Sequence, residues 1–281
     1  MELAYSELPL AIFSTLGPVG AGAFVVIALL AAKPIDDARR AKLDKLSFVA
    51  FVVVVVGMIG AFGHLANPLH APFVFARALT SPLSREIVVA VMFLAVALLY
   101  CIFAAAGKLQ GDTRTVCAVL VAVLGAAFAV FIGLAYFMDT ITTWNTPLTV
   151  IELVGAFFLG GSLLGAVFAV AAGCFDEVKV PVAAISVIGA LSFAGALAAH
   201  LAMASGITSR LADGADLVMS VMPLAVCAIA GSIVAAALAL GALKAKKPMA
   251  FLGFGCVVAI IAIFTGRLAF YGIQMSAGLF M

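Results

Sequence analysis

Eight long apolar runs, separated by short polar or proline-containing segments, constrain this sequence most. Each run has about 20 residues with almost no charge, the length that an α-helix needs to cross the hydrocarbon core of a membrane. The composition agrees, because 66% of the 281 residues are hydrophobic and 10% are charged. The sequence therefore predicts an all-α integral membrane protein with eight transmembrane helices, at about residues 8–32, 46–66, 84–106, 115–138, 147–172, 182–204, 217–243 and 249–277.

The connections between these runs are too short to hold a soluble domain. We therefore expect residues 1–281 to form a single transmembrane domain, with any soluble chemistry supplied by another polypeptide. Pro-Leu opens the first and the fifth run, and His-Leu-Ala occurs near the ends of the second and the sixth. This similarity favours two four-helix halves, 1–138 and 139–281, with His200 as the counterpart of His64. Chance similarity in a sequence rich in Ala and Leu is the alternative.

The basic residues indicate an orientation. Eleven of the 15 Lys and Arg residues lie in connections that share one side of the predicted bundle, which predicts that this side faces the cytoplasm. The N- and C-termini would then both lie outside. The first of these connections, residues 33–45, is mixed in charge, and we expect it to form a short interfacial helix.

The connection at 67–84 differs from the others because it is apolar and broken by three prolines. We expect it to lie in the membrane interface or to fold over the bundle. At its end, Ser81 and Pro82 are typical of an N-cap followed by proline at the first helical position.

Small residues at helical spacing indicate close helix packing. They form stripes in the first, second and fifth runs, at Gly17, Gly20, Gly22, Gly57, Gly60, Gly63, Gly160, Gly161 and Gly165. The five cysteines lie singly and form no Cys-x-x-Cys motif, so we expect them to fill space between helices and not to bind a metal.

The ionisable residues within the apolar runs carry the functional signal. Such groups are costly in a membrane and are candidates for function by default. The predicted topology places them near one face of the bilayer, and they are His64, Glu86, Glu152, His200 and Arg267. Structural roles are the alternative: a helix N-terminus favours a carboxylate such as Glu86, and Arg267 can extend to the interface.

A histidine and a carboxylate at one apolar pocket form a proton-accepting pair. Oxidation of a quinol needs such groups, since two electrons and two protons leave the ring. His64 and Glu86 are therefore the candidate catalytic residues. The candidate quinol-binding set adds five residues, Asn67, Pro68, Arg77, Arg267 and Tyr271.

Three segments resemble the DmsC-type membrane anchor subunit of the dimethyl sulfoxide reductase family, which belongs to the molybdopterin oxidoreductases. They are Leu8-Pro9-Leu10-Ala11-Ile12-Phe13, the segment from Gly63-His64-Leu65-Ala66-Asn67-Pro68 to Ser81-Pro82-Leu83-Ser84-Arg85-Glu86-Ile87, and Thr265-Gly266-Arg267-Leu268-Ala269-Phe270-Tyr271-Gly272. The sequence departs from the family pattern at Ala66, where Gly is usual, and at Arg85, where Asn is usual.

The resemblance implies a multi-pass protein of the bacterial cytoplasmic membrane that binds exchangeable menaquinol and carries no redox centre of its own. It implies that His64 and Glu86 serve quinol binding and oxidation. It also implies two partners, an iron–sulfur subunit with [4Fe–4S] clusters and a catalytic subunit with a molybdenum bis-pterin guanine dinucleotide cofactor. Nothing in the sequence indicates a nucleic-acid partner.

Two other functions remain open from the sequence. A transporter would need polar groups near the middle of the bilayer. An anchor that holds haem b and works as a quinone reductase could use His64 and His200 as axial ligands. The terminal substrate would bind a different polypeptide, and a quinone site can work in either direction.

Overall fold

The computed structural model describes residues 2–63, 81–209 and 212–276. Eight long helices in these ranges are apolar enough to cross a membrane, which confirms the predicted all-α membrane fold. The described elements are α1 (Glu2–Ser6), α2 (Leu8–Ala31), α3 (Asp37–Gly63), α4 (Pro82–Ala105), α5 (Gly111–Ala135), α6 (Leu148–Ala172), η2 (Phe175–Glu177), α7 (Lys179–Ser205), α8 (Gly214–Ala242) and α9 (Pro248–Gly272).

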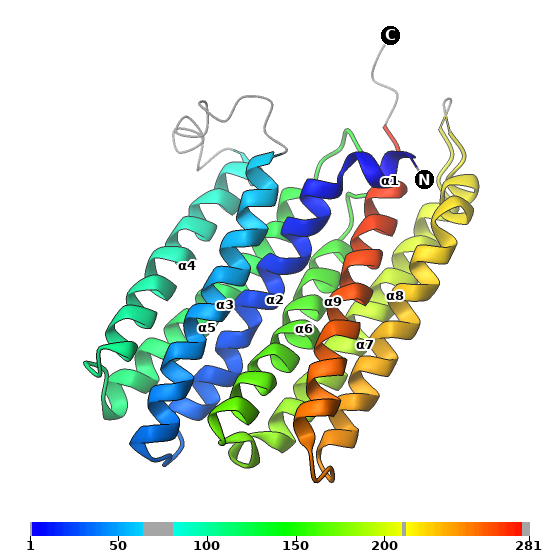
Figure 1. Ribbon diagram of the computed structural model, residues 1–281. Helices are drawn as coiled ribbons and strands as arrows, with labels where there is room; N and C mark the ends of the chain where they lie inside the picture. Colours follow the sequence, from blue (N-terminus) through cyan, green and yellow to red (C-terminus); the bar gives the residue numbers. More distant parts are fainter. Residues whose placement is uncertain (1, 64–80, 210–211, 277–281) are drawn as a thin grey trace.

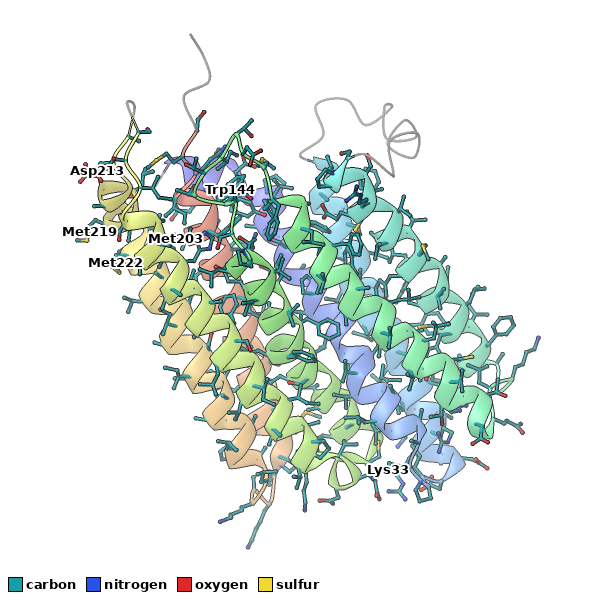
Figure 2. All side chains as sticks on the ribbon, turned by 180° about the vertical axis from the view of Figure 1, so that it is seen from behind. Lys33, Trp144, Met203, Asp213, Met219 and Met222 are labelled. Atoms are coloured by element: carbon teal, nitrogen blue, oxygen red, sulfur yellow. The ribbon has the colours of Figure 1, made fainter. Side chains whose placement is uncertain are left out.

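The helices run side by side in one bundle, and α1 and the end of α9 lie at the same end of it (Figure 1). We call this end the termini end. The opposite end, with the turns at 32–36, 106–110, 173–178 and 243–247, is called the basic end, and Lys33 marks it in Figure 2. The shared position of α1 and the end of α9 agrees with eight spans, while the assignment of the termini end to the outside stays a prediction.

Helices α2 and α6 form the centre of the bundle. Within their most apolar stretches, 78% and 72% of the residues are buried, against 22–44% in the other six long helices. They pack on each other, and each also contacts α3, α5 and α9. The outer helices expose large apolar side chains such as Val123, Leu191 and Phe254, as expected for surfaces that face lipid.

Glycine stripes allow the two central helices to touch. A β-carbon at Gly22 of α2 would lie 2.0 Å from the carbonyl oxygen of Phe157 in α6, and one at Gly161 would lie 2.3 Å from the Cα of Gly22. Only glycine permits this approach of two backbones, as the sequence predicted. The stripe does not extend to Gly63, which has no neighbouring atom within 4 Å among the described residues.

The start of α3 corrects one expectation. Residues 33–45 do not form a separate interfacial helix, since α3 begins at Asp37 and continues without a break to Gly63. Asp36 starts it by accepting the backbone N–H of Arg39 at 2.9 Å and pairing with its guanidinium. These two contacts, the backbone hydrogen bond first, hold the pKa of the Asp36 carboxyl below its usual value. The first turns of α3 bury Leu43 and Asp44.

The predicted start of the third span is confirmed. Ser81 is the N-cap of α4, its hydroxyl oxygen accepts the backbone N–H of Ser84 at 3.4 Å, and Pro82 is the first helical residue. Most of the apolar connection at 67–84 lies outside the described residues. The proposed division at residue 138 stays a prediction.

Candidate functional site

A cluster of enclosed polar side chains lies at the termini end, between the two central helices and α9. Its charged members are Glu152 on α6, His200 on α7 and Arg267 on α9, and all three are 0% exposed. Hydroxyl groups from other elements complete it. We call this set the buried polar cluster: Ser14, Tyr136, Glu152, His200, Arg267 and Tyr271.

Hydrogen bonding fixes the protonation of the Glu152–His200 pair. Nε2 of His200 lies 2.7 Å from the carbonyl oxygen of Thr143, which can only accept, so Nε2 carries a hydrogen. Nδ1 lies 2.7 Å from Oε1 of Glu152, and a contact this short between two acceptors requires a proton between them. The pair therefore holds one shared proton and is neutral as a unit.

Arg267 makes the cluster positive. Its guanidinium donates to the Ser14 hydroxyl at 3.0 Å through Nε, and to Oε2 of Glu152 at 3.4 Å through Nη1. It also lies 4.0 Å from the ring centroid of Phe270, a favourable cation–π distance. Because the Glu152–His200 pair is neutral, the enclosed cluster carries one net positive charge.

Two tyrosines extend the cluster toward the N-terminal half of the sequence. The hydroxyls of Tyr136 and Tyr271 are 2.5 Å apart, and Tyr271 lies 3.2 Å from Ser14. Nη2 of Arg267 donates to the Tyr271 hydroxyl at 3.4 Å. Tyr271 can therefore accept from Tyr136 and Arg267 while it donates to the carbonyl oxygen of Leu10, 3.3 Å away.

Glu86 lies on α4, outside this hydrogen-bonded network. Its side chain is buried, on the same helix face as the buried Ala90, Phe93 and Ala97. No group among the described residues donates a hydrogen bond to its carboxyl. The structure thus encloses a carboxyl with spare acceptor capacity on α4.

The other candidate residues divide into two groups. Arg267 and Tyr271 are fully enclosed, together with Glu152 and His200, for which the sequence indicated no partner. His64, Asn67, Pro68 and Arg77 lie outside the described residues. Their assignment to a quinol site stays a prediction.

Sequence reasoning missed the connection between α5 and α6. This segment supplies Tyr136, the Thr143 carbonyl and Trp144 to the site. The Trp144 indole N–H donates to the carbonyl oxygen of Phe270 at 3.0 Å, and the two rings stack with centroids 5.0 Å apart. Figure 2 places Trp144 near the termini end, opposite Lys33. The one sequence signal was that Trp144 is the single tryptophan and lies next to a predicted membrane boundary.

A second buried ion pair at the basic end was also missed. Nη1 of Arg114 on α5 lies 2.5 Å from Oδ1 of Asp44 on α3, and Nε of Arg114 donates to the carbonyl oxygen of Leu109 at 3.0 Å. Both side chains are buried. The pair joins two helices, and among the described residues the buried charged side chains lie toward one end of the bundle or the other.

The geometry of His200 argues against a haem ligand at this position. Both ring nitrogens are engaged, Nδ1 by Glu152 and Nε2 by Thr143. An axial ligand needs a free nitrogen lone pair directed at the iron. Across the described ranges, no three His, Cys, Asp or Glu side chains gather as metal ligands, and the five cysteines are free.

Comparison with known proteins identifies a family that this sequence matches. Residues 1–273 match the family described as DMSO reductase anchor subunit (DmsC). The sequence is 28% identical to that of YnfH, an anaerobic dimethyl sulfoxide reductase chain of Escherichia coli, with 99% of both proteins covered. It is 29% identical to the C subunit of anaerobic dimethyl sulfoxide reductase from Escherichia coli and 26% identical to that from Haemophilus influenzae, again over 99% of both proteins.

Family, length and fold agree: the match covers all eight long helices, and the aligned relatives have no large additional domain. The chain belongs to the DMSO reductase anchor subunit (DmsC) family and is a multi-pass membrane anchor of the bacterial inner membrane.

Proposed function

We propose that this anchor binds and oxidises menaquinol at its termini end and passes the electrons to an iron–sulfur subunit. The anchor itself is the quinol-oxidising part of the complex and does not reduce the terminal substrate. A molybdenum bis-pterin guanine dinucleotide in a catalytic subunit would carry out that reduction, and [4Fe–4S] clusters would connect the two sites. The names of the relatives, which are parts of dimethyl sulfoxide reductases, support this assignment.

The observation that carries the proposal is the enclosed carboxyl of Glu86. A carboxylate that is buried without a donor is unfavourable, and it gains when it accepts a hydrogen bond from a hydroxyl group. A quinol offers two such hydroxyls on an apolar ring. The next residues on the same face of α4, Ala90 and Phe93, are buried and apolar, so the carboxyl lies at the edge of an apolar region.

The chemistry requires two proton acceptors. When the quinol is oxidised, its two hydroxyl groups lose two protons and its ring loses two electrons. We assign one proton to Glu86 and the other to His64, while the electrons pass to the iron–sulfur subunit. Asn67, Pro68 and Arg77 would contact the ring or its substituents. Arg267 and Tyr271 would not contact the ring, and would influence the site through the hydrogen bonds of the buried polar cluster.

We further propose that the termini end faces outside and carries the soluble subunits. Eleven of the 15 Lys and Arg residues lie toward the opposite side in the predicted topology, which favours a cytoplasmic basic end. Electrons leaving a site at the termini end would then have a short route to a docked partner. A transporter would need charged groups in the middle of the bundle, and the buried charged side chains of the described residues lie toward its ends.

Turnover of the assembled complex tests the proposal. Glu86→Gln and His64→Ala are each expected to lower menaquinol-dependent turnover by roughly 100-fold or more, the range expected for a general acid or base. Turnover with a reduced dye that feeds the catalytic subunit directly should be unchanged. Glu177→Gln, at an exposed glutamate of the basic end, is the matched control. Full quinol turnover in both site variants would refute the assignment.

A further inference from the structure

In the connection between α5 and α6, residues 136–147, Thr143 and Trp144 make three hydrogen bonds to the C-terminal half of the bundle, and Ile141 pairs with Ser276. The Thr143 carbonyl accepts from Nε2 of His200 at 2.7 Å, and the Thr143 hydroxyl accepts the backbone N–H of Met275 at 3.2 Å. The Trp144 indole donates to the carbonyl oxygen of Phe270. Thr143 is 0% exposed, so these bonds have no water to replace them.

His200 is itself held firmly. Its Nδ1 is bound to Glu152, whose second oxygen accepts from Arg267. The imidazole therefore has one orientation, with Nε2 directed at the Thr143 carbonyl. This hydrogen bond joins the α5–α6 connection to a residue on α7, and no helical backbone hydrogen bond could take its place.

Tyr136 begins the same connection and depends on its packing. Its ring lies edge-on to Trp144 and to Phe270, with centroids 5.4 and 5.0 Å apart. A shift of Thr143 would move Trp144 and remove one wall of the Tyr136 ring. The Tyr136 hydroxyl lies 2.5 Å from the hydroxyl of Tyr271, so a displaced Tyr136 ring would break the contact between the two tyrosines.

We propose that His200 is a positioning residue: by anchoring Thr143, it holds Trp144 against Tyr136 and fixes the Tyr136 hydroxyl against Tyr271 in the buried polar cluster. This inference rests on the proposed role of the termini end in quinol oxidation. The Glu152–His200–Arg267 triad then works through the α5–α6 connection and does not touch the quinol. Its one shared proton keeps the imidazole in the single orientation that the connection needs.

Two substitutions separate the bonds that His200 makes. The amide nitrogen of glutamine lies near the position of Nε2, so His200→Gln keeps a donor for Thr143 and loses the bond to Glu152. The amide nitrogen of asparagine lies near the position of Nδ1, so His200→Asn keeps a donor for Glu152 and leaves the Thr143 carbonyl unsatisfied. Both variants are neutral amides, and each serves as the control for the other.

Fluorescence of the purified full-length protein in detergent reports the connection directly, because Trp144 is its single tryptophan. We expect His200→Asn to shift the Trp144 emission to longer wavelength and to increase quenching by acrylamide, since the indole loses its enclosed position. His200→Gln should keep the wild-type spectrum. This readout needs no quinol, and it tests the anchoring of the connection even if the proposed function fails.

Quinol-dependent turnover of the assembled complex tests the second step. We expect His200→Asn to lower kcat by roughly 10- to 100-fold, the range expected when a side chain that supports the reaction is displaced, with little change in KM. His200→Gln should restore most of this loss, and dye-dependent turnover should be constant in both. Tyr136→Phe should lower kcat similarly, and adding His200→Asn to it should have little further effect because both act through one hydroxyl.

Several results would overturn the inference. Wild-type fluorescence in His200→Asn would show that His200 does not hold the connection. A larger loss of turnover in the glutamine variant than in the asparagine variant would assign the effect to the bond with Glu152 in place of the bond with Thr143. Multiplying losses in the double variant with Tyr136→Phe would exclude Tyr136 as the intermediary. Full quinol turnover of the Glu86→Gln complex, together with the expected fluorescence changes, would refute the proposed function and keep only the structural anchor.

Discussion

Replacing Glu152 with glutamine should cost much less stability than replacing it with leucine. The reason is the proton shared between Glu152 and His200, which leaves the enclosed cluster with one net positive charge on Arg267. In Glu152→Gln, the amide group donates to Nδ1 of a neutral His200 and its oxygen accepts from Arg267. The charge of the cluster and its number of hydrogen bonds are then unchanged, and we expect a loss of at most about 1 kcal/mol.

Glu152→Leu removes both bonds and keeps the volume. Nδ1 of His200 and Nη1 of Arg267 then stay buried without a partner, because both side chains are fully enclosed. Removing one partner of a buried ion pair costs about 3–5 kcal/mol. At about 2–4 °C per kcal/mol for a protein of this size, the Tm should fall by roughly 6–20 °C, against at most about 4 °C for the glutamine variant.

Thermal unfolding of the purified protein in detergent, followed by circular dichroism, measures both shifts. Glu177→Gln at the basic end is the control for loss of a carboxylate, and its Tm should be that of the wild type. If His200 were neutral and Glu152 ionised, the cluster would be neutral and Glu152→Gln would create an unpaired buried charge. A Tm for the glutamine variant as low as that for leucine would therefore refute the shared proton.

Two further substitutions test the packing of the bundle. Gly22→Ala should lower the free energy of unfolding by about 1–3 kcal/mol or more, and so lower the Tm, because its β-carbon would meet the Phe157 carbonyl of α6. Gly195→Ala on α7 has free space around its β-carbon, so its Tm should be unchanged or higher. An equal response would contradict the backbone contact. Asp44→Ala should cost about 3–5 kcal/mol by leaving the Arg114 guanidinium without its carboxylate. Asp112→Ala, at an exposed residue in the first turn of α5, should cost at most about 1 kcal/mol, and equal Tm values would remove the Asp44 pair as a support of α3.

Much of the fold follows from local properties of the sequence. The length of each apolar run and the cost of polar backbone in lipid fix eight spanning helices. Ser81 and Pro82 define the start of α4 because capping involves neighbouring residues only. The glycines at 22 and 161 indicate close approach because no other residue lacks a β-carbon. Boundaries are harder to place where polar and apolar residues alternate, as at the start of α3.

The sequence by itself determined which residues cross the membrane and at which end the ionisable groups of the spans gather. Only the tertiary structure decided their partners: Glu152 and His200 are 48 positions apart, and Ser14 and Arg267 are 253 apart. In a membrane, lipid and protein interior are both apolar, so the pattern of a helix does not reveal which of its faces meets another helix. Packing alone brings Tyr136 and Thr143 to the cluster and leaves Glu86 without a donor among the described residues.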